Sequence, residues 1–466
     1  MVQEILSTNK KAVQINRDHA KYGTFAEIGA GQEVARFFFK VGGAAGTIAK
    51  SISAYDMTVS DAIYGSTARY VSRQRLQSML DCEFDLLRKR LDDSVGDKTT
   101  FFAFANTVKA RSFLQTDESY GWLGIRFQVS PRTEPSEIIM HIRMLDKSNL
   151  QQQEALGVFG VNVIHGAFFL HQDMVAFLKS LLDNLTRKRV EVDMIKVSGP
   201  VFKNEDNRIM SLELVRLGLA DSAIFTSEGD VVQPSEVLYK KAILVERGSF
   251  RPVTRVSLDI LDCAKTQFSQ EVGVQGDEIT VLTEMTLRNL SQEGEINHKD
   301  FLDRVDLLGA LGKTVLISNY GRFYRLAAYL FRYTNKKIGL AMGARTVKEI
   351  FKEKYYSDLE GGILESFGRL FKNDLKLYVY PQKDPKTGEL ITTENLKVAS
   401  NLQHLYAHLL ENQYLLDLRA YDESCLTIFA RDVLKKIQDA DPSWETMVPA
   451  QAVALIKTRG LFAYRA

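Results

Sequence analysis

Cysteine, proline and tryptophan are scarce in this chain of 466 residues, which contains three, nine and two of them. The three cysteines, Cys82, Cys263 and Cys425, are odd in number, far apart and without the spacing of a metal site. This usage is typical of reduced thiols in a reducing cytoplasm. No Gly/Ser-rich or Pro-rich linker is visible, so domain borders have to be inferred from changes of pattern.

The chain also lacks an excess of one charge and a long apolar run. Sixty Lys and Arg residues against 58 Asp and Glu residues give a net charge of +2. We therefore expect neither a nucleic acid nor a membrane as a partner. No apolar stretch approaches the roughly 18 residues of a membrane helix, and the first residues show no secretory-signal pattern. These absences predict a cytoplasmic protein.

The composition of the chain predicts a large folded core, since 45% of the residues are hydrophobic and 25% are charged. The length predicts two or three domains, and the changes of pattern predict four regions. We expect a mainly helical region over 1–98, a mixed α/β region over 99–240, a repeat of strands and helices over 241–381, and a helical tail over 382–466.

The repeat is the most informative pattern of the chain. The short apolar strands AILV, ITVL, TVLI and IGLA begin near positions 243, 279, 314 and 337, and a polar cluster with arginine and an amphipathic helix follow each of them. Strands alternating with helices in this way are typical of βαβ units, which predicts an α/β fold with a mainly parallel sheet.

The number of candidate strands leaves the architecture open. The segments VNVIHG, VDMIKVS, SAIF, AILV, ITVL, TVLI, IGLA and LKLYVY make eight candidate parallel strands. Eight admits a (β/α)8-like barrel, and a doubly wound open sheet gives the same local pattern. Both architectures place the carboxyl ends of the parallel strands, and therefore the polar clusters, at one mouth or edge.

The polar clusters supply the candidate site residues. Arginine pairs with phosphate or carboxylate through two parallel hydrogen bonds, so several arginines at one rim predict an anion site. The predicted ligand-binding residues are Arg247, Arg251, Arg288, Asn319, Arg322 and Arg345.

Three further residues are candidates for catalysis. Glu246 and Glu284 end equivalent strands and could act as acid, base, metal ligand or ribose-hydroxyl acceptor. Lys196 ends an earlier strand and could be a nucleophile or a phosphate contact. The alternative is that each glutamate pairs with a neighbouring arginine and fixes the helices to the sheet.

Better-known motifs do not support a specific chemistry. EIGAGQE lacks a convincing buried strand before it, and in GGAAGTIAKS three residues separate Gly46 from Lys50 where a phosphate loop needs adjacency. His404 and His408 lie four residues apart with no third ligand nearby in the sequence, so no metal site is predicted. The sequence names no cofactor.

Four tracts carry a family resemblance: YGTFAEIGAGQEVARFFFKVGGAAGTIAKSISAYDM, MLDKSNLQQQEALGVFGVNVIHGAFF, VLYKKAILVERGSFRPVT and EKYYSDLEGGILESFGRLFKNDLKLYVYP. They resemble a family of uncharacterised bacterial proteins of this length that carries two conflicting labels, nicotinate-nucleotide adenylyltransferase and TonB-dependent receptor. The first label implies a cytosolic α/β enzyme with paired histidines of the His-x-Gly-His type after an early strand, and this chain has no such pair.

Two hypotheses follow. The first is a cytosolic enzyme, of a nucleotidyl- or phosphate-transferring kind, that acts on a phosphorylated and possibly nucleotide-like small molecule through its strand-end arginines and glutamates. The second is a non-catalytic scaffold protein that assembles with copies of itself through apolar segments such as VARFFFKVGGAAG and TRGLFAYRA. Under either hypothesis we expect a homo-oligomer or a larger self-assembly.

Overall fold

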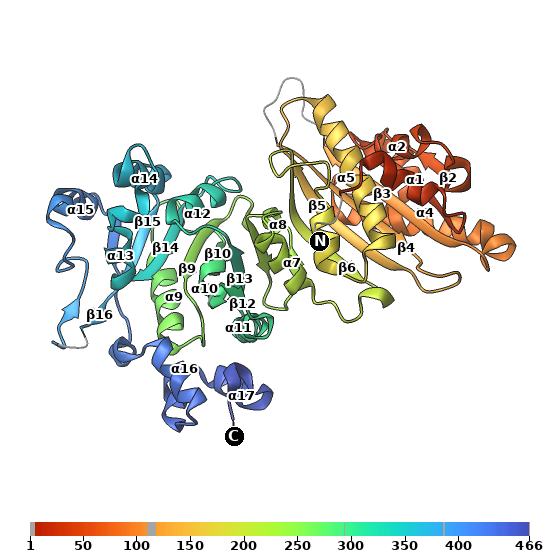
Figure 1. The fold of residues 1–466 in the computed structure, drawn as a ribbon. Helices are drawn as coiled ribbons and strands as arrows, with labels where there is room; N and C mark the ends of the chain where they lie inside the picture. Colours follow the sequence, from red (N-terminus) through yellow and green to blue (C-terminus); the bar gives the residue numbers. More distant parts are fainter. Residues whose placement is uncertain (1–4, 110–117, 293, 385–386, 466) are drawn as a thin grey trace. The chain divides into compact units, whose positions relative to one another are not determined.

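The computed structural model describes residues 5–109, 118–292, 294–384 and 387–465 (Figure 1). Its internal contacts divide the chain into two compact units, Met1–Ala220 (unit 1) and Asp221–Ala466 (unit 2). Each unit has its own sheet, and the two are described separately. Among the described residues, no helix combines the length and the apolar character that crossing a membrane requires.

Unit 1 is built on a six-stranded sheet in the order β2-β1-β3-β4-β5-β6. The first three strands of this order are parallel, and β4, β5 and β6 continue the sheet in antiparallel pairs. The strands are β1 (Lys21–Gly29), β2 (Ile48–Ile52), β3 (Thr100–Lys109), β4 (Ser119–Phe127), β5 (Ser136–Met144) and β6 (Val190–Ser198).

Helices cover both faces of this sheet. Gly124 of β4 faces Leu76 and Leu80 of α4, whereas Gly160 of α5 faces Phe104 of β3, which places α4 and α5 on opposite faces. Helices α1 and α2 pack against α5. The helices are α1 (Thr8–Asn16), α2 (Val34–Lys40), α3 (Met57–Tyr64), α4 (Arg73–Val95), α5 (Asn149–Phe169), α6 (Met174–Ser180) and α7 (Asn207–Arg216).

Unit 1 departs from the sequence-based expectation in two places. The region 1–98 contains the parallel strands β1 and β2 besides its helices. The segment VNVIHGAFF, expected to be a strand, is the second half of α5. Residues 155–167 of α5 are all buried, and a helix buried on every side reads as a continuous apolar run that periodicity cannot distinguish from a buried strand.

Unit 2 is built on an eight-stranded sheet in the order β18-β15-β14-β9-β10-β13-β7-β8. The six strands from β18 to β13 are parallel, and β7 and β8 continue the sheet in antiparallel pairs. The strands are β7 (Ser222–Phe225), β8 (Val231–Val232), β9 (Ala242–Arg247), β10 (Ile279–Thr286), β13 (Thr314–Ser318), β14 (Ile338–Gly343), β15 (Lys376–Tyr380) and β18 (Leu415–Asp417).

Both faces of the unit 2 sheet are covered, which explains the uninterrupted apolar runs of its central strands. Ile243 and Val245 of β9 belong to a core with α12, α13, α14 and α15, whereas Ala242 and Leu244 pack with α9 on the other face. The main helices are α8 (Pro234–Leu238), α9 (Arg255–Phe268), α10 (Leu287–Leu290), α11 (His298–Ala310), α12 (Phe323–Leu330), α13 (Ala344–Ile350), α14 (Gly362–Leu370) and α15 (Gln403–Glu411).

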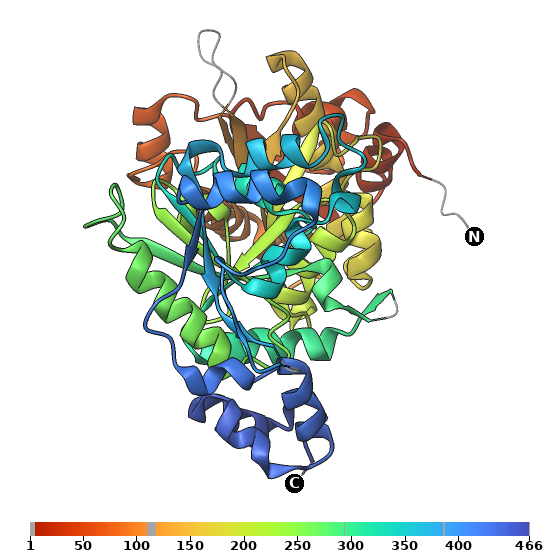
Figure 2. The ribbon, with the colours of Figure 1, turned by 90° about the vertical axis from the view of Figure 1, so that its left-hand side faces the viewer.

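The C-terminal segment forms an additional layer, drawn in deep blue in Figure 2. It contains α16 (Ala430–Gln438) and α17 (Ala450–Arg459), and α17 and the residues after it contact α11. Leu461 and Phe462 are buried there, and the Phe462 amide donates to Asp303 of α11 at 3.0 Å. Two short antiparallel pairs complete the unit: β11 (Ser291–Gln292) with β12 (Glu295–Ile296), and β16 (Gln382–Lys383) with β17 (Leu390–Ile391).

The structure confirms a mixed α/β fold with sheets rich in parallel strands, and no sheet of the described residues is closed. The barrel alternative failed because its strand count was wrong. VNVIHG is helical, VDMIKVS belongs to the antiparallel part of the unit 1 sheet, and SAIF runs antiparallel to β13. The parallel strand β18 was missed, because LLD is too short to stand out from the helical pattern around it.

Candidate functional site

The strand order of unit 2 contains a switch point. When the six parallel strands are numbered along the chain, their spatial order is 3-2-1-4-5-6, the order of the doubly wound nucleotide-binding sheets. The connections leave β9 in one direction and β14 in the other, and it is at such a reversal that open α/β sheets form a ligand crevice. The chain leaves β9 at Arg247 and β14 at Gly343.

Arg247 and Glu284 form a buried ion pair beside this switch point. They are laterally paired on β9 and β10, and the guanidinium donates to both carboxylate oxygens at 2.7 and 2.8 Å. Glu284 is fully buried and also accepts from the Ser318 hydroxyl at 2.5 Å. Arg247 stacks on the Phe323 ring, 4.2 Å from its centroid. This is the ion-paired arrangement that the sequence left open as an alternative to a ligand site.

Two more of the predicted arginines have carboxylate partners. Arg251 pairs with Asp300 of α11, and Arg322 donates two hydrogen bonds to Asp358 at 2.5 and 3.0 Å. Buried Arg304, one turn after Asp300, shares that carboxylate and donates to the carbonyl oxygen of Ser249 at 3.1 Å. The loop after β9 is therefore fixed to α11 through charged contacts.

Glu246 lies on the opposite face of the sheet from Glu284. It is level with Thr283, whereas Glu284 is level with Arg247, and laterally paired residues share a face. Glu246 is 5% exposed, and its Oε2 atom has no hydrogen-bond partner within the part of the chain that the structure describes. Burial raises the pKa of Glu246 well above its usual value, against the opposing charge of Lys313. The two glutamates therefore do not converge on one reacting atom.

Arg345 differs from the paired arginines. It is exposed and forms no ion pair among the described residues. It lines a cavity of about 660 Å³ next to the carboxyl ends of β14 and β15. The cavity lies between α13 and the segment that carries β16 and β17. It is lined by Arg345, Lys348, Glu349, Lys352, Gln382, Asp384, Thr387, Glu389, Ile391, Asn395, Leu396 and Lys397.

The remaining predicted residues lie apart from this cavity. Arg288 is exposed on α10, and Asn319 is exposed after β13, where its backbone amide donates to the Asp221 carbonyl at 2.9 Å. Lys196 is on β6 of unit 1 and thus belongs to a different sheet from the other candidates.

Sequence reasoning missed three lysines of the cavity. Lys348 and Lys352 follow Arg345 by three and seven residues, a spacing that places side chains on one face of a helix. The sequence alone could therefore have indicated these two lysines. Lys397 approaches from a segment after β17, and no local pattern connects it to α13.

The donor groups of the described residues give no candidate for a metal centre. Within the residues that the structure describes, no three His, Cys, Asp or Glu side chains form a group that could hold a metal ion. The first strand-to-helix connection of the doubly wound sheet, residues 247–255, contains no histidine. The adenylyltransferase label implies a histidine pair after an early strand, so its catalytic residues have no counterpart in this turn.

Comparisons with known proteins show weak structural likenesses. No family model and no curated protein sequence matches the chain. The competence/damage-inducible protein CihA from Agrobacterium tumefaciens is 15% identical, with 35% of this chain and 97% of that chain covered and a TM-score of 0.25. A CinA superfamily protein from Klebsiella pneumoniae is 14% identical, with 34% and 96% covered and a TM-score of 0.25.

A third solved structure is a nicotinic acid mononucleotide adenylyltransferase from Plasmodium falciparum complexed with NaAD. It is 13% identical, with 48% of this chain and 98% of that chain covered and a TM-score of 0.30. Likenesses of this strength establish neither the fold nor the activity of the chain.

Proposed function

We propose that unit 2 binds a phosphorylated, nucleotide-like small molecule at the carboxyl edge of its sheet. The observation that carries this proposal is the strand order, which reverses between β9 and β14. In open α/β sheets, ligands bind in the crevice outside the carboxyl ends of the strands at such a reversal. The cavity lined by Arg345 lies on the β15 side of β14, one of the two strands that flank the reversal, and its lining comes from residues that follow β14 and β15.

The charges of this cavity favour an anionic ligand. Lys352 is paired with Glu349, whereas Arg345, Lys348 and Lys397 form no ion pair among the described residues. Asp384 and Glu389 also line the cavity, so its four cations exceed its three carboxylates by one charge, which favours an anion over a cation. The planar fork of Arg345 suits two oxygens of a phosphate.

The cavity also offers contacts for the remainder of such a ligand. Ile391 and Leu396 supply apolar surface, and the Asn395 and Gln382 amides can donate and accept hydrogen bonds. A volume of about 660 Å³ falls within the range of small-molecule sites. A nucleotide could use all of these groups, with its phosphate on the cations, its polar sugar on the amides and its flat base on the apolar surface.

The resemblance to a family labelled nicotinate-nucleotide adenylyltransferase makes nicotinate mononucleotide and ATP the first ligands to test. Catalysis, by nucleotidyl or phosphate transfer, is a further proposal. Glu246 and Glu284 lie on opposite faces, so at most one of them can reach a given ligand. A coupled assay with both nucleotides therefore has to compare Glu246→Gln and Glu284→Gln separately.

The test of binding is a thermal-shift screen of the purified protein against orthophosphate, AMP, ATP, nicotinate mononucleotide and unphosphorylated adenosine. We expect the phosphorylated ligands to raise the Tm and adenosine to leave it unchanged. Loss of a charge-assisted contact costs about 1.5–3 kcal/mol, so Arg345→Ala should weaken binding roughly tenfold or more.

The matched control is Arg431→Ala, which removes another exposed arginine without an ion pair among the described residues. Arg345→Lys should recover part of the affinity, because it keeps the charge and loses the fork. If Arg345→Ala and Arg431→Ala bind every ligand equally well, Arg345 does not belong to the site.

A further inference from the structure

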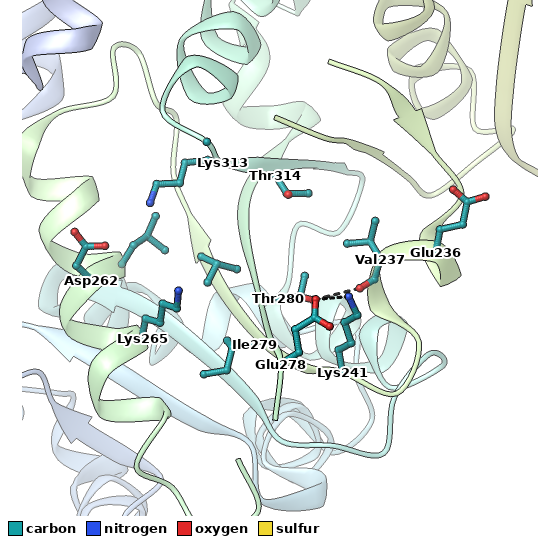
Figure 3. A pocket seen from close by; sticks show the side chains of 13 residues that line it. Glu236, Val237, Lys241, Asp262, Lys265, Glu278, Ile279, Thr280, Lys313 and Thr314 are labelled. Carbon is teal, nitrogen blue, oxygen red and sulfur yellow. Dashed lines mark hydrogen bonds and ion pairs between the residues drawn. The ribbon is translucent and has the colours of Figure 1, made fainter. Parts of the chain in front are cut away.

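Unit 2 has a second cavity at the opposite edge of its sheet (Figure 3). Its volume is about 410 Å³, and it is bordered by α9, by the starts of β10 and β13, and by the chain before β9. These are the amino ends of the parallel strands, whereas the Arg345 cavity lies at their carboxyl ends. A ligand here would occupy a site separate from the one proposed above.

Two lysines converge on one side of this cavity. Lys265 reaches in from α9 and Lys313 from the residue before β13, and Figure 3 shows both amines on the same side. Neither forms an ion pair among the described residues. On the other side, Lys241 is held by Glu278 at 2.6 Å. Asp262 is the carboxylate beside these two amines, so this side carries one positive charge in excess, whereas Glu236 and Glu278 lie on the side of Lys241 and make the lining as a whole neutral.

Glu246 is the buried carboxyl group nearest in effect to Lys313. It lies on the α9 face of the same sheet, and burial raises its pKa well above the usual value, against the opposing charge of Lys313. Lys313 is half-buried, so its charge is screened less by water and salt than the charge of an exposed lysine.

The base of the cavity is apolar and carries hydroxyl groups. Leu261, Ile279 and Val281 supply the apolar surface, and Thr314 borders it. The Thr280 hydroxyl donates to the Val237 carbonyl oxygen at 3.2 Å, which closes the base on the α8 side. An anion held by the two lysines would therefore have room beside it for an attached organic group.

We propose that the cavity between α9 and the starts of β10 and β13 is a second anion site, which holds the phosphate of a small molecule between Lys265 and Lys313. The ligand chemistry is that of orthophosphate or a phosphomonoester. Because the site borders both α9 and β10, its occupancy would add contacts across the first half of the doubly wound sheet.

The test is calorimetric titration of orthophosphate, AMP and adenosine into the full chain carrying Arg345→Ala, which removes the carboxyl-edge contact. We expect AMP or orthophosphate to bind and adenosine not to bind. Lys265→Met and Lys313→Met should each weaken binding at least tenfold. Lys372→Met, which removes an exposed lysine outside both cavities, should leave it unchanged.

The comparison of ligands identifies the class of ligand, and the Arg345→Ala background separates this site from the one at the carboxyl edge. Tighter binding of AMP than of orthophosphate supports a phosphomonoester, and equal binding supports a free phosphate. Absence of binding, or binding that neither lysine variant weakens, overturns the second site. Because the titration is carried out in the Arg345→Ala background, that result leaves the carboxyl-edge proposal to its own test. Circular dichroism of each variant confirms that it is folded.

Discussion

At the residue scale, the buried ion pair between Arg247 and Glu284 gives the clearest prediction for the free energy of unfolding. Removing one member of a buried ion pair leaves the other charge buried, which typically costs about 3–5 kcal/mol. We expect Arg247→Met to lower the free energy of unfolding of unit 2 by this amount, because Glu284 is fully buried. Denaturant unfolding followed by circular dichroism measures it.

The matched control for this variant is Arg369→Met, which breaks the exposed pair with Glu365. Exposed pairs contribute about 0–1 kcal/mol, so the control should change the free energy of unfolding little. If Arg247→Met unfolds at the same denaturant concentration as Arg369→Met, the buried pair does not hold the edge of the sheet together.

Glu27 of unit 1 gives a pH dependence. Burial raises its pKa from 4.5 to about 7, although the amides of Val34, Ala35 and Asn106 donate to it. The folded state therefore binds the proton more tightly than the unfolded state. We expect the contribution of Glu27 to stability to be fully present below pH 4.5, to fall by about 3 kcal/mol in all as the pH rises from 4.5 to 7, and to be constant above that.

The Glu27→Gln variant isolates this contribution. A neutral amide does not titrate, so the difference between wild type and variant should change between pH 4.5 and 7 and nowhere else. Unfolding curves at several pH values give that difference. A difference that is constant across this interval would show that Glu27 keeps an ordinary pKa.

At the element scale, α5 depends on a glycine for its close approach to the sheet of unit 1. A Cβ atom at Gly160 would lie 2.4 Å from Val34 Cγ2 and 3.1 Å from Phe104 Cζ. Overpacking of this kind costs about 1–3 kcal/mol, which is the loss we expect for Gly160→Ala in chemical denaturation. Adding Val34→Ala should recover part of it, since the overlapping methyl group is then absent.

The helical glycine Gly368 of α14 is the control. Nothing lies within 4 Å of a Cβ added there, so Gly368→Ala should raise stability by up to about 1 kcal/mol through helix propensity alone. Equal effects at both glycines would contradict the close packing of α5.

The elements also show what the sequence could predict. The strands AILV, ITVL, TVLI and IGLA became β9, β10, β13 and β14, because apolar runs bounded by polar clusters and helices are a local signal. The register and order of strands depend on contacts between distant residues, and the pattern could not choose between barrel and open sheet. The fully buried helix α5 gave the same apolar run as a strand.

For the candidate site, the sequence could predict positions but not partners. Arg345 lies at the carboxyl edge where the sequence placed it, and its role in binding a ligand stays a prediction. The partners Asp300 and Asp358 come from other parts of the chain, so the ion pairs of Arg251 and Arg322 could not be foreseen from local sequence. Lys397, Lys265 and Lys313 reach their cavities through the fold and carry no local signal.

At the scale of the whole molecule, each unit has its own sheet. We expect residues 221–466 expressed alone to fold and to retain both proposed ligand sites, since the cavities are lined by residues of that unit only. Thermal unfolding of the fragment with and without ligand measures this. A fragment that is unfolded would show that unit 2 depends on unit 1.

Self-assembly is the rival account at this scale. Two apolar segments are candidates for contacts between subunits. In the C-terminal segment, Leu461 and Phe462 are already buried against their own chain. In the segment VARFFFKVGGAAG, Phe39 is 56% exposed. Light scattering with Phe39→Asp as the comparison tests the idea: large assemblies of the wild type that the variant disperses would favour a scaffold.

The central claim is that a phosphorylated ligand binds at the carboxyl edge of unit 2 through Arg345. Calorimetric titration of the ligand from the thermal-shift screen into wild type, Arg345→Ala and Arg431→Ala tests it most directly. We predict wild-type affinity for Arg431→Ala and an affinity at least tenfold weaker for Arg345→Ala. Unchanged affinity in Arg345→Ala, with the protein folded, would contradict the account.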